Sequence, residues 1–156
     1  MKWTDVEIWR CLLENDGDPI YAETLCYDFG MTRRQLLART SALEQYLPIK
    51  VVSGKDIMFQ LSAPMDEKVS ATAKVLAAFY RCTPEKILRI TNTISIAGYM
   101  SLEEISTLTG VPVKDLIYTL RVMPNIHMQK DFNKKNHYIR RKENVPVNMG
   151  TANAST

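Results

Sequence analysis

A pattern of apolar residues and one glycine occurs twice in this chain of 156 residues, at an offset of 80 positions. The matched pairs are Ala22 and Leu102, Leu25 and Ile105, Gly30 and Gly110, and Leu36 and Leu116. In each copy, the first two apolar residues anchor a short helix, the glycine turns the chain, and the leucine anchors a second helix across the first. This duplicated helix-turn-helix unit predicts a mainly helical chain with two similar halves.

Three short polar segments mark expected helix starts. Residues 4–7, 32–35 and 101–104 each have the form of a capping box, in which two side chains three positions apart satisfy the first backbone amides. An apolar stripe at helical spacing follows the first two boxes. Thr83 and Pro84 predict one more helix, with threonine as cap and proline in the first turn.

A β-hairpin is expected at the end of each unit. Residues 49–61 contain two β-rich runs around a turn with Gly54. Residues 126–130 and 137–141 are also strand-like, and residues 132–136 turn between them. The expected fold class is therefore mainly α with small β-hairpins (α+β).

Both units resemble the winged helix-turn-helix superfamily. The first copy carries this resemblance through Ala22, Gly30, Thr32, Leu36, Leu43 and the hairpin, and the second through Leu102, Gly110, Leu116 and its hairpin. The resemblance covers most of residues 3–142 and implies two tandem domains, 1–64 and 83–143, joined by a helix in 65–82. The second copy departs from the usual pattern at Pro112, where a serine or threonine cap is commoner. Residues 144–156 are small and polar, which predicts a disordered tail.

The resemblance implies duplex DNA as the partner, because in DNA-binding members the third helix enters the major groove and the wing touches the backbone. With Leu36 at the centre of the buried face, steps of about 100° per residue give the outer face. In the first copy this face holds Arg34, Ala38, Ser41 and Gln45, and in the second Lys114, Tyr118 and Arg121. Arg33 and Arg39 lie on its flanks, where phosphate contacts are expected. An ordinary solvated helix face is the alternative interpretation.

Positive charge is concentrated in the second half. Residues 1–64 carry seven basic and nine acidic side chains, and residues 65–156 carry thirteen and eight, so the net charge of +3 divides into −2 and +5. Six cations lie in the second hairpin: Lys130, Lys134, Lys135, Arg140, Arg141 and Lys142. They predict a phosphate clamp. The alternative is a hairpin whose lysines discourage pairing between sheet edges.

The segment 66–81 is apolar almost all round its expected helix. Such a helix is buried between other elements or packs on a partner. Two interpretations follow, a linker helix between the two domains and the contact surface of a homodimer.

Enzyme and metal chemistry are not indicated. The three cysteines are far apart and odd in number, and the two histidines have no cysteine near them in sequence. No phosphate-cradling glycine loop and no catalytic triad spacing stands out, so we expect no cofactor and no enzyme activity. No apolar run approaches the roughly 18 residues that a membrane span needs. The N-terminus lacks an apolar signal core, and we expect a cytoplasmic protein.

The sequence therefore predicts a DNA-binding protein, in particular a transcriptional regulator. The alternative is a protein-interaction module that uses tandem winged helices as a scaffold in a larger complex, which the acidic first half fits better. RNA binding is a weaker third interpretation, because aromatic platforms for single strands are not obvious in the sequence.

Overall fold

The computed structural model describes residues 1–15, 17–97, 99–131 and 136–141. Its first half contains α1 (Trp3–Glu14), β1 (Ile20–Tyr21), α2 (Ala22–Phe29), α3 (Arg33–Leu43), β2 (Lys50–Val52) and β3 (Met58–Gln60), and α4 (Met65–Tyr80) follows. Its second half contains α5 (Pro84–Ala97), β4 (Tyr99–Ser101), α6 (Leu102–Thr109), α7 (Val113–Thr119), the 3₁₀ turn η1 (Leu120–Val122), β5 (Ile126–Asp131) and β6 (Asn136–Arg141). The chain is mainly helical with small antiparallel sheets, as the sequence predicts. No described helix is both long and apolar enough to cross a membrane.

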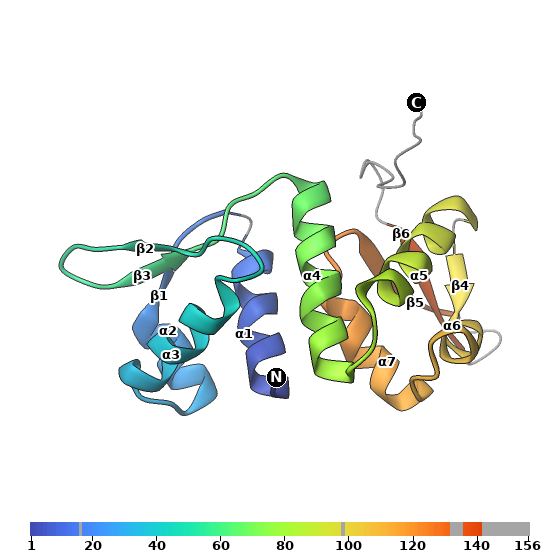
Figure 1. Ribbon diagram of the computed structural model, residues 1–156, viewed down its shortest axis with the longest axis horizontal. Helices are drawn as coiled ribbons and strands as arrows, with labels where there is room; N and C mark the ends of the chain where they lie inside the picture. The colour runs from blue at the N-terminus through green and yellow to red at the C-terminus, as the bar shows by residue number, and fades with distance from the viewer. Residues whose placement is uncertain (16, 98, 132–135, 142–156) are drawn as a thin grey trace.

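Each half holds a small antiparallel sheet of three strands, in the order β1-β3-β2 in the first half and β4-β6-β5 in the second. The sequence predicts the two hairpins but not the third strand of either sheet. Ile20 pairs with Phe59, and Ser101 pairs with Tyr138. Both added strands precede the short helix of the repeated unit, so the two halves share the same order of helices and strands, with η1 as the only insertion among the described elements (Figure 1).

Helix starts agree with the sequence at two capping boxes and differ at one. Thr32 accepts a hydrogen bond from the Gln35 amide at 3.2 Å, and Gln35 returns one to the Thr32 amide at 2.9 Å. Ser101 accepts a hydrogen bond from the Glu104 amide at 3.2 Å, which is one half of the expected capping box. The prediction that Thr4 caps the first helix is wrong, because α1 begins at Trp3 and the carboxylate of Asp5 accepts from the Lys2 amide at 2.9 Å.

Helix α4 lies between the two halves and packs against both α1 and α5 (Figure 1). The indole of Trp9 in α1 donates a hydrogen bond to the hydroxyl of Thr72 in α4 at 2.9 Å, with both side chains fully buried. Buried side chains of α4 belong to the same hydrophobic cluster as those of α1 and α5, so one apolar core extends from the first half to the second.

The apolar side chains of α4 are used within the chain. Val69, Ala71, Val75 and Leu76 are all buried. The exposed positions of this helix are Asp66, Glu67, Lys74 and Ala78. A homodimer that formed through residues 66–81 would therefore have a mostly polar contact surface.

Candidate nucleic-acid interface

The turn between α2 and α3 is made by a glycine in the left-handed conformation. Gly30 has φ 60° and ψ 40°, and the amide of Met31 after it bonds back to the Cys26 carbonyl at 3.0 Å. Gly110 ends α6 in the same way, with φ 77°. Because glycine adopts this conformation without a Cβ clash, both sequence copies turn at the predicted residue.

The predicted inner and outer faces of α3 are confirmed. Leu36 and Leu43 are buried, and the hydroxyl of the buried Thr40 bonds to the Leu36 carbonyl at 3.1 Å. Helix α3 ends at Leu43. Of the predicted outer positions, Arg34, Ala38 and Ser41 lie on α3 and are exposed, whereas Gln45 is exposed but follows the end of the helix.

One flank of this outer face is partly enclosed. Ala38, Arg39 and Gln45 line a hollow of about 450 Å³ together with Met1 and Ala78, which belong to the chain start and to α4. The opposite flank of α3 does not line this hollow.

The opposite flank of α3 holds four exposed residues, which we call the α3 strip: Arg33, Arg34, Leu37 and Ser41. The sequence predicted three of them and missed Leu37. Arg33 makes an ion pair with Glu23 at 3.4 Å, but both side chains are so exposed that this pair contributes little. Helix α3 contains no acidic residue, so the α3 strip is basic although the first half as a whole is acidic.

Arg39 has a different role from the one predicted. It pairs with the buried carboxylate of Asp5 at 3.5 Å and so joins α3 to α1. A phosphate contact by Arg39 would compete with this pair. Arg39 therefore acts first as a structural residue, and its position on the flank of the helix gave no indication of that.

The third helix of the second half is shorter than predicted and less basic than α3. Lys114 is exposed and Leu116 is buried, as expected, but the α-helix ends at Thr119. Its one lysine is followed by an acidic residue, Asp115. Tyr118 lies on α7, and the structure describes its backbone position only.

Arg121 does not continue the outer face of α7. It belongs to η1, and because a 3₁₀ turn advances the chain by about 120° per residue, the ideal helical step no longer holds there. Arg121 lines a hollow of about 380 Å³ with Arg10 and Lys68, between η1 and helices α1 and α4. The structure thus places Arg121 at the junction of the two halves rather than beside Lys114 on one straight helix face.

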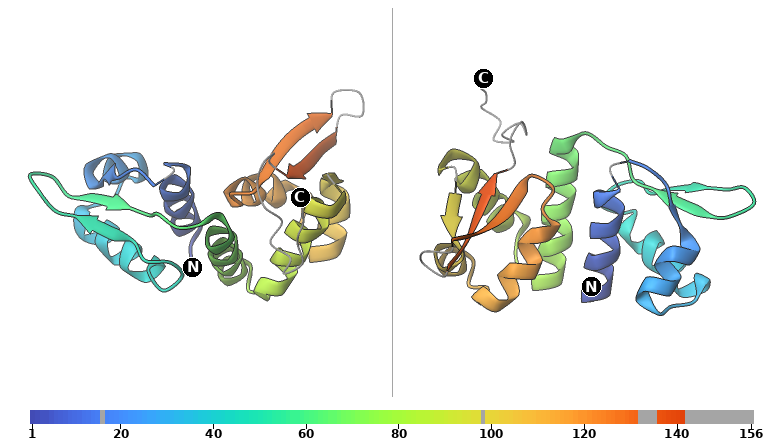
Figure 2. Two further views of the ribbon diagram at one scale, coloured as in Figure 1. Left: turned by 90° about the horizontal axis from the view of Figure 1, so that it is seen from above. Right: turned by 180° about the vertical axis from the view of Figure 1, so that it is seen from behind.

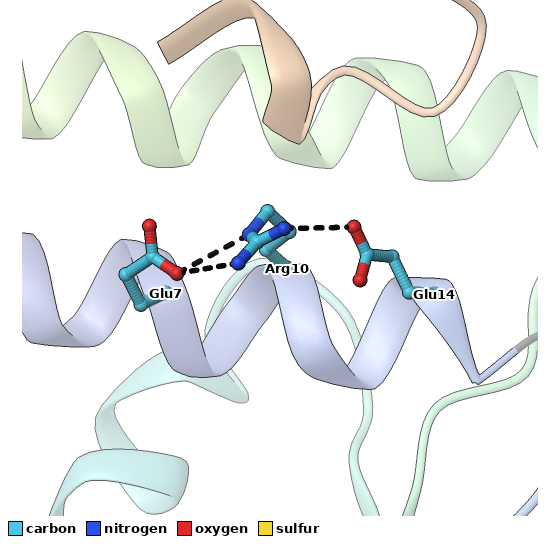
Figure 3. Close-up of polar contacts among 3 residues, drawn as sticks. All are labelled: Glu7, Arg10 and Glu14. Atoms are coloured by element: carbon cyan, nitrogen blue, oxygen red, sulfur yellow. Dashed lines mark hydrogen bonds and ion pairs between the residues drawn. The ribbon is translucent and has the colours of Figure 1, made fainter. Parts of the chain in front are cut away.

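Acidic side chains surround Arg10 near this junction. Arg10 contacts Glu7 at 2.9 Å and Glu14 at 3.0 Å, all from α1 (Figure 3). Partial burial lowers the pKa of Arg10, but the hydrogen bond and charge of Glu7, aided by Glu14, outweigh burial and raise this pKa overall. The spacing of three and four residues between Arg10 and its two partners is a recognisable helical pattern, so the sequence alone carries a signal for these two ion pairs.

The second hairpin projects from the helices of its half (Figure 2). In the backbone register of β5 and β6, Lys130 is opposite His137, His127 is opposite Arg140, and Ile126 is opposite Arg141. Arg140 and Arg141 are consecutive in β6. Lys134, Lys135 and Lys142 lie outside the described residues.

Reactive thiols and metal ligands are not gathered at any described position. Cys11, Cys26 and Cys82 are all free and partly buried. Burial raises the pKa of the Cys11 and Cys82 thiols, which keeps them protonated and weakly nucleophilic at neutral pH. Within residues 1–15, 17–97, 99–131 and 136–141, no group of three histidine, cysteine or acidic side chains could hold a metal ion.

Comparison of the chain with protein-family models, curated proteins and solved structures gave no match.

Proposed function

We propose that this chain is a DNA-binding protein made of two tandem winged helix-turn-helix domains joined by α4. The α3 strip contacts the duplex, with Arg34 and Ser41 as donors to bases or phosphates and Arg33 on the phosphates. Lys114 and the second hairpin add contacts in the other half. The function is that of a transcriptional regulator without enzyme activity, acting in the cytoplasm.

The observation that carries this proposal is the exposed, acid-free face of α3. A recognition helix needs polar side chains that reach outward from a helix whose opposite side is anchored. Leu36 and Leu43 supply that anchor, and the α3 strip supplies the cations. Two adjacent arginines in the first turn also add to the positive end of the helix dipole, an arrangement that favours an anion at this place.

The test is fluorescence anisotropy with a labelled random-sequence duplex in about 50 mM and about 200 mM salt. We expect micromolar binding that weakens at least roughly tenfold between the two salts. The pair Arg34→Glu and Lys114→Glu should reduce affinity further. Lys74→Glu is the control for a single charge reversal, because Lys74 is exposed and belongs to α4 rather than to α3 or α7. A variant with Lys134→Glu and Lys135→Glu measures how much of the affinity for the duplex depends on the second hairpin.

Two results would contradict the proposal. One is the absence of binding at both salt concentrations. The other is an equal loss of affinity in the Lys74→Glu control and in the Arg34→Glu and Lys114→Glu variant, because a general charge effect would then explain the binding.

The second candidate function is a protein-interaction module, which is favoured by exposed apolar side chains in the first half. Tyr27 is 88% exposed, Tyr21 52%, Val51 44% and Leu37 39%. Exposed apolar side chains mark a protein-interaction site where they form one contiguous patch. In this case the chain would bind no duplex, and Tyr27→Ser would weaken capture of a protein partner while Arg34→Glu would not.

A further inference from the structure

A hollow of about 490 Å³ lies where the start of α1, the end of α4 and the start of α7 meet. Its lining residues are Trp3, Phe79, Tyr80, Arg81 and Asp115. They come from both halves of the chain and from the helix between them. A hollow of this size and at such a junction is typical of small-molecule sites.

Three aromatic rings form one wall of this junction hollow. The ring centres of Trp3 and Phe79 are 5.4 Å apart, and those of Phe79 and Tyr80 are 4.9 Å apart at 77°. All three side chains are only partly buried, so ring surface remains open to a ligand. The Tyr80 hydroxyl makes a long hydrogen bond of 3.5 Å to the Asp115 carbonyl, which ties the wall to α7. This wall offers aromatic faces and edges to a flat partner.

Arg81 stands at a backbone position that favours glycine. It ends α4 with φ 58° and ψ 44° and is the one described residue other than glycine with a positive φ. At the ends of α2 and α6 the same conformation is taken by Gly30 and Gly110. An arginine here strains the backbone, and strain of this kind concentrates at binding sites. The long cationic side chain, which lines the hollow, is the feature that glycine would lack.

We propose that this hollow binds a small planar aromatic anion. The flat ring of the ligand lies against Trp3, Phe79 and Tyr80, and its anionic group pairs with the guanidinium of Arg81. Guanidinium groups match carboxylates in geometry and also stack on aromatic rings. Asp115 also lines the hollow and disfavours a second negative charge, so the ligand is a monoanion.

The ligand test uses the full chain labelled with ¹⁵N and three probes added in turn. These are 2-naphthoate, the neutral naphthalene-2-carboxamide, and the non-planar cyclohexanecarboxylate. The readout is the indole N–H signal of Trp3, and that of Trp9 is the internal reference because Trp9 is buried and bonded to Thr72. We expect a saturable shift of the Trp3 signal with 2-naphthoate and at least roughly tenfold weaker binding of the other two probes.

The substitution test separates binding from folding. Arg81→Gly should relieve the backbone strain and raise Tm by roughly 2–4 °C, yet weaken 2-naphthoate binding at least tenfold. A variant that is more stable but binds less cannot be explained by misfolding. Arg81→Gln should also lose affinity, while Arg34→Gln, a matched change at an exposed arginine on α3, should keep it.

Several outcomes would overturn the inference. They are a linear, non-saturable response, equal shifts of the Trp3 and Trp9 signals, equal affinity for the three probes, and full affinity in Arg81→Gly. A lower Tm of Arg81→Gly would remove the argument that arginine is kept against the preference of the backbone. None of these outcomes depends on whether the chain binds DNA.

Discussion

The hydrogen bond between Trp9 and Thr72 is the buried polar link between the first half and α4. Its length is 2.9 Å and both side chains have no exposed surface. Thr72→Val keeps the shape of the side chain but removes the acceptor, which leaves the indole N–H buried without that partner. A buried donor left unsatisfied costs about 1–3 kcal/mol. We therefore expect the free energy of unfolding to fall by this amount.

Urea unfolding followed by tryptophan fluorescence measures this loss. With an m value of roughly 2 kcal/mol per M, the midpoint of unfolding should fall by roughly 0.5–1.5 M. Thr24→Val is the matched control, because Thr24 is exposed in α2 and surface changes usually stay within about 0.5 kcal/mol.

A double-mutant cycle with Trp9→Phe decides whether the hydrogen bond is the cause. In the Trp9→Phe background the donor is already gone, so Thr72→Val should cost less there, with a coupling energy of roughly 0.5–3 kcal/mol. The reasoning is refuted if Thr72→Val leaves the midpoint unchanged, or if it costs the same in both backgrounds.

Four further predictions concern caps, turns, pH and mass. Thr32→Ala removes the acceptor for the Gln35 amide and should lower stability by about 1 kcal/mol in thermal unfolding; no change would show that the cap is replaced by water. At Gly110 nothing lies within 4 Å of an added Cβ, so Gly110→Ala should cost about 1–2 kcal/mol through its positive φ alone, and an unchanged Tm would contradict this. Burial, with the charge of Asp115, raises the pKa of Tyr80 from 10.0 to about 12. The stability that the protonated Tyr80 contributes is therefore complete below pH 10 and is lost as the pH rises towards 12. Tyr80→Phe should flatten this loss of stability with pH, and an identical pH profile in the variant would contradict the prediction. Sedimentation should give the monomer mass of 17.8 kDa, and twice that mass would support the homodimer interpretation instead.

Local chemistry made several features predictable from the sequence. Gly30 and Gly110 turn the chain where the repeat places them, because their left-handed conformation depends on the residue itself. The Thr32 cap is equally local, since its two hydrogen bonds join residues three positions apart. The inner and outer faces of α3 follow from helical periodicity, and the α3 strip was therefore mostly found in advance.

Features that depend on distant partners were missed. β1 and β4 are short and carry no pattern of their own, because they form only by pairing with β3 and β6. Asp5 becomes the acceptor at the start of α1 in a place where it also meets Arg39 from another helix. The junction hollow adds Trp3 from α1 and Asp115 from α7 to the consecutive residues Phe79, Tyr80 and Arg81, and no single stretch of sequence shows that these three segments meet.

The central position of α4 sets the spacing between the two halves. Its sixteen residues form a rigid rod that is packed side-on between the halves and held by buried contacts on both sides, instead of swinging as a loose tether. A flexible tether tolerates a range of distances between two binding sites, whereas a rod accepts one distance and one rotational phase. A double helix that touched both halves would need its two contact points at a fixed separation and at a fixed angle around the helix axis. Insertion of about 5 base pairs between those contacts would turn one of them to the far side of the duplex and abolish simultaneous engagement.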